Sequence, residues 1–121
     1  MSGAPSGSRE LPINHLGAVF AALADPSRRT IVERLAASGR ATSTELAGEL
    51  PMTRQAVAKH LATLEHAGLV RARREGRQTV YRPDPAPLRD AGAWLDRVGA
   101  EWDERLAALA RHVGQPPQAA P

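Results

Sequence analysis

The sequence TRQAVAKHLATLEHAGL, residues 53–69, decides the fold of this chain. Within it Val57, Leu61 and Leu64 recur at the spacing of one apolar face of an α-helix. The threonine that opens the stretch can cap the start of this helix, and Gly68 can supply the left-handed residue that ends it. The stretch therefore predicts one amphipathic helix with a defined beginning and end.

The outward face of this helix carries long hydrogen-bond donors and almost no negative charge. At about 100° per residue, Gln55 and Lys59 lie opposite the apolar stripe. The residues of this face and its edges are Arg54, Gln55, Ala58, Lys59, His60 and Ala62. Such a face suits a helix that enters a DNA groove, although the solvated outer face of an ordinary helix accounts for the same residues. The neighbouring segments decide between the two interpretations.

A second, shorter helix is predicted immediately upstream, over residues 43–50. Thr42 and Glu45 have the spacing of a capping box, and Pro51 ends the helix because the residue before a proline avoids the α region. A turn of two or three residues then joins the two helices. Two helices joined so tightly form a helix-turn-helix, whose second member is presented to DNA.

The periodicity changes after Gly68. Residues 69–74 and 78–82 are short β-prone runs on either side of Glu75-Gly76-Arg77, which predicts a β-hairpin. A basic hairpin directly after a helix-turn-helix is a wing, whose arginines can reach the phosphate backbone or the minor groove. A hairpin whose charge serves only solubility is the weaker alternative, because five arginines repel one another without a partner.

Positive charge is concentrated in this same part of the chain. Residues 51–82 hold seven basic and two acidic side chains, a formal charge of +5, whereas the remainder sums to −2. Such a distribution is the expected footprint of a surface that binds a polyanion.

Three further helices complete the predicted fold. Two precede the helix-turn-helix, over residues 14–24 and 26–37, and Asp25-Pro26 restarts the chain between them. A long last helix runs from Asp84-Pro85 to about residue 112, and one apolar seam follows its whole length. The fold class is therefore mainly α with a small β-hairpin: a winged helix-turn-helix of about five helices and a two-stranded wing.

The last helix has more apolar surface than one packing partner requires, which suggests a homodimer. Folding back onto its own domain, in part through the first helix, is the alternative. The predicted dimer interface consists of Leu16, Val19, Phe20, Leu88, Leu95, Val98, Trp102, Leu106 and Leu109.

The bulk composition bounds the class of protein. At 121 residues the chain fits one domain, which we expect over residues 11–113 between disordered tails at 1–10 and 114–121. The chain has no cysteine, so disulfides, zinc–thiolate sites and cysteine nucleophiles are excluded. No membrane-length apolar run, signal peptide or catalytic motif is present, so we expect a cytoplasmic protein without cofactor or enzymatic activity.

With these elements in order, the sequence resembles the ArsR/SmtB family of winged-helix transcriptional regulators. Three segments carry the resemblance: ALADPSRRTIVERL, STELAGELPMTRQAVAKHLATLEHAGLVRARREGRQTVYR and AWLDRVGAEWDERLAALARHV. The resemblance implies a homodimer of first and last helices that binds a palindromic operator and represses its own and neighbouring genes. It assigns DNA contacts to Thr53, Arg54, Gln55, Ala58, Lys59, His60, Arg73, Arg74, Arg77 and Tyr81. Ser43 and Thr44, at the start of the preceding helix, are further candidates for DNA contact. Family members often have serine at Ala58, where alanine can still touch a thymine methyl group.

Many relatives in this family sense metals, through a cysteine pair near the third helix or through Asp and His on the last helix. Neither pattern occurs here, and Trp94 and Trp102 resemble a branch without metal-binding motifs. One possible metal site is not excluded: His15 and His112 lie on the two helices that are expected to meet. We therefore predict a metal-independent DNA-binding repressor with an unidentified small-molecule or protein inducer. A protein-interaction adaptor that lacks specific DNA binding is the alternative.

Overall fold

The computed structural model describes residues 15–114. The chain divides into two compact units, Met1–Ala91 and Gly92–Pro121. The expected tail over residues 1–10 lies outside the described residues, as does nearly all of the tail after residue 113. Within the described part, no helix is long and apolar enough to cross a membrane.

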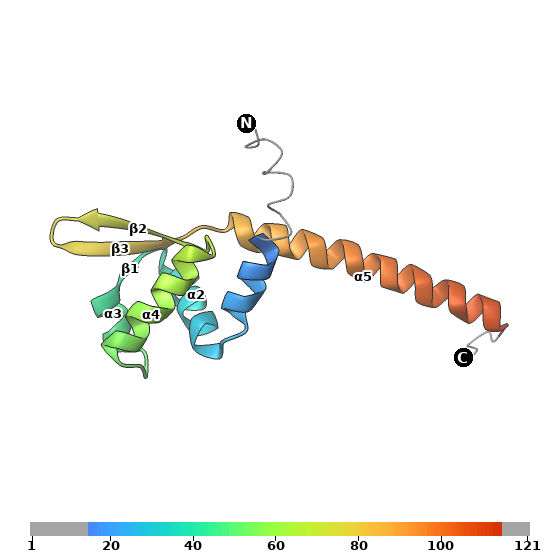
Figure 1. Ribbon diagram of the computed structural model, residues 1–121, viewed down its shortest axis with the longest axis horizontal. Coiled ribbons are helices and arrows are strands. Elements are labelled where there is room, and N and C mark those ends of the chain that lie inside the picture. The colour runs from blue at the N-terminus through green and yellow to red at the C-terminus, as the bar shows by residue number, and fades with distance from the viewer. Residues whose placement is uncertain (1–14, 115–121) are drawn as a thin grey trace, which may run out of the picture. The chain divides into compact units, whose positions relative to one another are not determined.

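Among the described residues, four helices lie wholly within the first unit (Figure 1). The first is described over residues 15–23, and α2 (Pro26–Ser38), α3 (Ser43–Glu49) and α4 (Arg54–His66) follow. The Asp25 carboxylate caps α2 by accepting hydrogen bonds from the amides of Ser27 and Arg28 at 2.7 and 3.3 Å. The predicted restart at Asp25-Pro26 is therefore confirmed.

The helix-turn-helix consists of α3 and α4, joined by residues 50–53. The predicted capping box is confirmed, because the Thr42 hydroxyl accepts from the Glu45 amide at 3.0 Å and the Glu45 carboxylate accepts from the Thr42 amide at 2.9 Å. A bidentate ion pair between Arg34 of α2 and Glu49 holds the end of α3. Local caps and one ion pair thus define the first helix of the motif.

The helix α4 begins and ends where its sequence predicts. The Thr53 hydroxyl accepts from the Ala56 amide at 3.0 Å. At the other end, Gly68 adopts φ +82°, its amide donates to Glu65 and the Leu69 amide donates to Leu64, both at 2.9 Å. This pair of hydrogen bonds is a Schellman motif, which ends the helix and turns the chain toward the wing.

The wing belongs to a three-stranded antiparallel sheet with the order β1-β3-β2. Its strands are β1 (Ala41–Thr42), β2 (Val70–Glu75) and β3 (Gln78–Pro83). Glu75 pairs with Gln78, so the turn consists of Gly76 and Arg77 alone, and Gly76 has φ +63°. The prediction of a two-stranded sheet missed β1, because two residues are too short to show a period.

The core of the first unit lies between its helices and the sheet. Its apolar side chains come from every element and are fully or almost fully buried. They include Val19, Ile31, Leu35, Leu46, Val57, Leu61, Leu64 and Val80. The apolar stripe predicted for residues 53–69 is therefore the part of α4 that faces the core.

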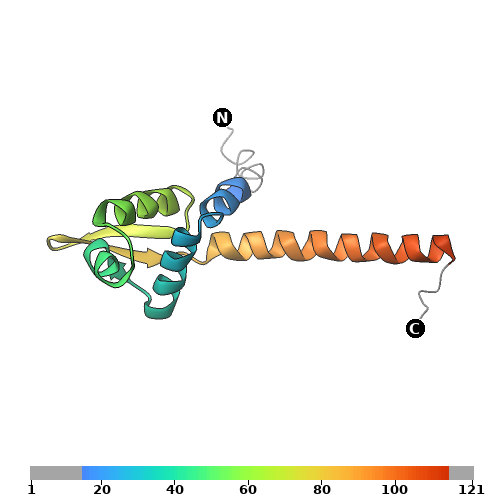
Figure 2. The same cartoon turned by 90° about the horizontal axis from the view of Figure 1, so that it is seen from below.

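The last helix, α5 (Ala86–Val113), is 28 residues long and continuous (Figure 2). Its predicted apolar seam is largely uncovered: Leu95, Trp102, Leu106 and Leu109 are 53, 69, 60 and 55% exposed. Among the other predicted dimer residues, Leu88 is exposed, Phe20 and Val98 are half-buried, and Leu16 and Val19 are buried in the first unit. The predicted dimer itself stays a prediction.

Candidate nucleic-acid interface

The outward face of α4 presents its donors to solvent. Gln55, Ala58 and Lys59 are exposed, as are Thr53 and Arg54 at the start of the helix. Within residues 15–114, the side chains of Arg54, Gln55 and Lys59 form no hydrogen bond or ion pair with the protein. These three side chains are therefore available to an external partner, and they carry only positive charge or amide groups.

Two residues with hydroxyl side chains, Ser43 and Thr44, open α3 directly after β1. Ser43 is half-buried and Thr44 is exposed. Both belong to the first turn of α3, where backbone amides lack helical acceptors. A phosphate oxygen is a suitable partner for such hydroxyl and amide donors.

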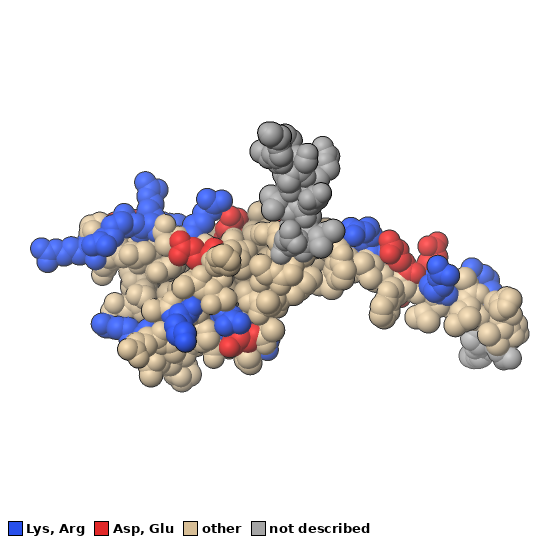
Figure 3. Space-filling model, viewed as in Figure 1, with Lys and Arg blue, Asp and Glu red and all other residues tan. Residues whose placement is uncertain are grey.

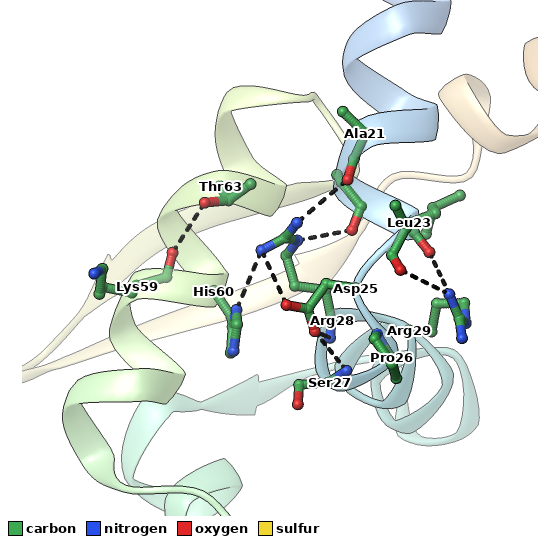
Figure 4. A network of polar contacts seen from close by, with 12 residues as sticks. Ala21, Leu23, Asp25, Pro26, Ser27, Arg28, Arg29, Lys59, His60 and Thr63 are labelled. Carbon is green, nitrogen blue, oxygen red and sulfur yellow. Dashed lines mark hydrogen bonds and ion pairs between the residues drawn. The ribbon is translucent and has the colours of Figure 1, made fainter.

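His60 differs from its neighbours on α4 because its side chain is half-buried. Its Nδ1 lies 3.5 Å from Nη1 of Arg28, which comes from α2 (Figure 4). The sequence places His60 at the edge of the apolar stripe but gives no sign of this contact, because 32 residues separate the two side chains.

The hairpin carries the strongest positive charge of the first unit (Figure 3). Arg73, Arg74 and Arg77 are exposed, and Nε of Arg74 donates to the Gly76 carbonyl at 3.2 Å. None of these three arginines has a carboxylate partner within the described residues. They are the wing arginines whose positive charge no neighbouring carboxylate balances.

The other two wing arginines are paired with carboxylates. Arg71 donates to Asp84 at 2.9 Å and Arg82 donates to Glu75 at 2.8 Å. The hydrogen bonds from these arginines hold the pKa values of Asp84 and Glu75 below their ordinary values. Both carboxylates therefore stay ionised at neutral pH and reduce the charge that Arg71 and Arg82 offer to DNA.

Glu75 has a further partner, Arg40, whose Nη2 lies 3.3 Å from the Glu75 carboxylate. Arg40 precedes β1 and pairing in the sheet brings it near the wing, which the sequence did not indicate. Tyr81 is half-buried in β3, and burial, together with the charge of Glu65, raises the pKa of its hydroxyl. The Tyr81 hydroxyl is therefore a neutral donor at physiological pH.

Loss of the unpaired wing charge is expected to weaken binding to every DNA sequence alike. In Arg73→Ala/Arg77→Ala, the slope of log affinity against log salt concentration should fall by about two, because about one phosphate contact is lost with each arginine. Fluorescence anisotropy at several salt concentrations measures this slope. Arg97→Ala/Arg111→Ala removes the same charge from α5 and should leave the slope unchanged; equal slopes in the two variants would contradict a phosphate-binding wing.

No group of three or more His, Cys, Asp or Glu side chains that could hold a metal occurs within residues 15–114. His15 lies against Gly68, since a Cβ at Gly68 would be 3.5 Å from Cε1 of His15.

The exposed side chains of α4 and the wing offer hydrogen-bond donors and positive charge. A helix-turn-helix followed by a basic hairpin, with this chemistry on its exposed face, defines a winged helix-turn-helix protein.

Comparison with known proteins identifies the family. Residues 23–73 match a family model described as a helix-turn-helix domain. The chain is 44% identical over 92 residues to the HTH-type transcriptional regulator Rv2034 of Mycobacterium tuberculosis, covering 76% of this chain and 82% of the relative. It is 31% identical to the arsenic resistance transcriptional regulator ArsR1 of Pseudomonas putida, covering 83% of this chain and 80% of the relative.

A solved structure agrees with these relatives. The ArsR-like transcriptional regulator from Rhodococcus sp. RHA1 is 42% identical and superposes with a TM-score of 0.75, covering 82% of this chain and 92% of the other. The chain belongs to the ArsR family of winged-helix transcriptional regulators. It is a DNA-binding regulator, and its family is not one of enzymes.

Proposed function

We propose that this regulator is a homodimeric repressor that binds a palindromic operator near its own gene, in the cytoplasm. The observation that carries the proposal is the set of donors on α4, Arg54, Gln55 and Lys59, which have no partner among residues 15–114. The wing arginines without a carboxylate partner there accompany them. Helices of this kind read base edges, while the flanking contacts to phosphate fix the position of the protein on the duplex.

Gln55 and Lys59 supply the base contacts in this proposal. A glutamine amide matches the N6 and N7 edge of adenine, and a lysine donates to the O6 and N7 acceptors of guanine. The Ala58 methyl group lies beside them on the same exposed face and suits contact with a thymine methyl group. Ser43, Thr44, Thr53, Arg54, His60 and Tyr81, together with the wing arginines Arg73, Arg74 and Arg77, serve as phosphate or groove-wall contacts.

The exposed seam of α5 supports the dimer. Residues 92–113 belong to a single helix, and one helix cannot bury its own apolar stripe. The largest side chain of that stripe, Trp102, is 69% exposed. A second copy of the chain presents the same stripe and can cover it, with the first helix of each copy alongside. A two-fold dimer presents two copies of α4 and therefore requires an operator with two-fold symmetry.

The composition supports the proposal that this regulator works without a thiolate-bound metal. The relatives include the arsenical resistance operon repressor of Escherichia coli and the cadmium sensor CMTR of Mycobacterium tuberculosis. Soft ions of this type are held by thiolate ligands, and none of the 121 residues here is cysteine. The release signal in this proposal is a small molecule, a partner protein or the amount of regulator present.

Fluorescence anisotropy tests the proposed function. The purified chain is titrated into labelled DNA from upstream of its own gene and into a scrambled duplex, at several salt concentrations. Tighter binding to the upstream DNA, with a steep loss of affinity as salt rises, supports a sequence-specific regulator of its own gene. An absence of binding even at low salt would leave the protein-interaction adaptor as the better function. Repression itself is tested by a reporter from the same promoter, whose expression should rise when the gene is deleted.

A further inference from the structure

The Arg28 side chain links the end of the first helix to the recognition helix α4 (Figure 4). Nε of Arg28 donates to the Ala22 carbonyl at 2.7 Å, and Nη2 donates to the Ala21 carbonyl at 3.2 Å. Nη1 faces His60 at 3.5 Å and the Asp25 carboxylate at 3.7 Å. All three nitrogens of the guanidinium group are therefore engaged, and the side chain is only 18% exposed.

The charges around this link come from Asp25 and the arginine itself. Burial acts to raise the pKa of Asp25, but the hydrogen bonds from the Ser27 and Arg28 amides and the charge of Arg28 lower it further than burial raises it. The ionised Asp25 carboxylate then holds Arg28 from the side opposite the helix carbonyls. Arg28 is fixed in place from the first helix, from the start of α2 and from α4.

The contact with Arg28 favours one of the two neutral tautomers of His60. A guanidinium group has five N–H donors and no acceptor. Nδ1 of a neutral His60 can therefore meet Arg28 only as an acceptor, which puts the proton on Nε2. Nε2 lies on the other side of the imidazole ring, so its N–H points away from Arg28.

We propose that Arg28 is a positioning residue for DNA binding: it holds His60 with Nε2–H turned outward as a donor to a phosphate oxygen of the DNA backbone. This inference rests on the proposed contact of α4 with DNA. Arg28 acts from inside the protein, since each of its three guanidinium nitrogens already has a protein partner and the side chain is only 18% exposed. It acts through the orientation and the tautomer of His60.

The neighbouring Arg29 provides a matched control. Its Nη1 donates to the carbonyls of Leu23 and Ala24 at 2.7 and 3.3 Å, so it also caps the end of the first helix. Within the described residues its side chain has no hydrogen bond or ion pair with α4. Lysine in place of either arginine keeps the charge and can still donate to a carbonyl, but it cannot span the carbonyls and the imidazole ring together.

Operator affinity should separate the two substitutions. Arg28→Lys is expected to weaken binding to the upstream DNA about three- to tenfold, the range of one hydrogen bond, and Arg29→Lys to leave it unchanged. Both variants should lose similar amounts of thermal stability. In a His60→Ala background, Arg28→Lys should cause no further loss of affinity. A loss of the same size in that background would overturn the proposal, because Arg28 would then act through the fold and not through His60.

Two substitutions of His60 test which ring nitrogen matters. Glutamine places its amide nitrogen near the position of Nε2, and asparagine places its amide nitrogen near the position of Nδ1. His60→Gln is expected to bind more tightly than His60→Asn. The reverse order would overturn the outward role of Nε2.

Nuclear magnetic resonance tests the positioning step without DNA. The spectra are recorded on the free protein at a pH where histidine is neutral. They should show a proton on Nε2 of His60 and none on Nδ1. Arg28→Lys should mix the two tautomers, and Arg29→Lys should not. A proton on Nδ1 in the parent chain would overturn the proposal even if the DNA is bound. If the tautomers follow this pattern but the upstream DNA is not preferred over scrambled DNA, the operator assignment fails and the positioning by Arg28 stands.

Discussion

Leu106→Glu/Leu109→Glu is expected to convert the proposed dimer to a monomer and to weaken operator binding about 10²- to 10⁴-fold. The two leucines are 60 and 55% exposed on α5 and lie on the same face of the helix. Two carboxylates there would be buried against a second copy without partners, at a large cost in free energy. Once the dimer is lost, each half-site is bound independently, and the gain from simultaneous contact disappears.

Ala107→Glu/Ala108→Glu is the matched control for this variant. It adds the same charge to the same turns of α5, at exposed positions away from the seam. Sedimentation equilibrium should give a monomer for the leucine variant and a dimer for the control, and anisotropy should show weakened binding for the leucine variant alone. A leucine variant that remained a dimer would exclude this part of α5 from the interface.

Gln55→Ala/Lys59→Ala is expected to lower the ratio of operator affinity to scrambled-DNA affinity about 30-fold or more. Each good base contact contributes about 1–3 kcal/mol of discrimination. Both side chains are exposed and have no partners among the described residues, so the melting temperature should hardly change. The measurement is the ratio of the two affinities at one salt concentration. Lys59→Ala alone should lose part of that ratio.

The control for this second variant lies at the far end of the same helix. Thr63→Ala/His66→Ala alters two exposed residues of the last turns of α4, whereas base edges are contacted from the first turns. The control should keep the affinity ratio of the parent chain. Equal losses in the two variants would mean that α4 does not enter the groove by its N-terminus.

The parts of the fold that the sequence predicts well are those defined by residues two to five positions apart. The caps at Asp25, Thr42 and Thr53 and the helix end at Gly68 are all confirmed. Each depends on a side chain or a backbone angle that acts on its own helix end. The helical phase of α4 is equally local, so the exposure of Gln55 and Lys59 could be predicted from spacing alone.

The sequence could not predict the contacts that depend on packing between elements. Pairing of Arg40 with Glu75 requires the short strand β1, and the contact of Arg28 with His60 requires α2 to lie against α4. Which wing arginines remain unpaired also depends on the register of β2 and β3. Charge counting gave five equivalent wing arginines, whereas Arg71 and Arg82 are held by carboxylates.

The left-handed Gly68 has a consequence for how such a regulator can change over evolutionary time. The direction of the chain between α4 and the wing is fixed by the φ angle of +82° at Gly68 and by two amide hydrogen bonds. Residues other than glycine rarely adopt such a φ angle. Both hydrogen bonds join backbone atoms, so no exposed side chain of α4 takes part in that junction. Substitutions on the outer face of α4 can therefore alter the preferred DNA sequence, while the placement of α4 relative to the wing stays unchanged. New binding specificities can arise in descendants of this gene one residue at a time, without redesign of the scaffold.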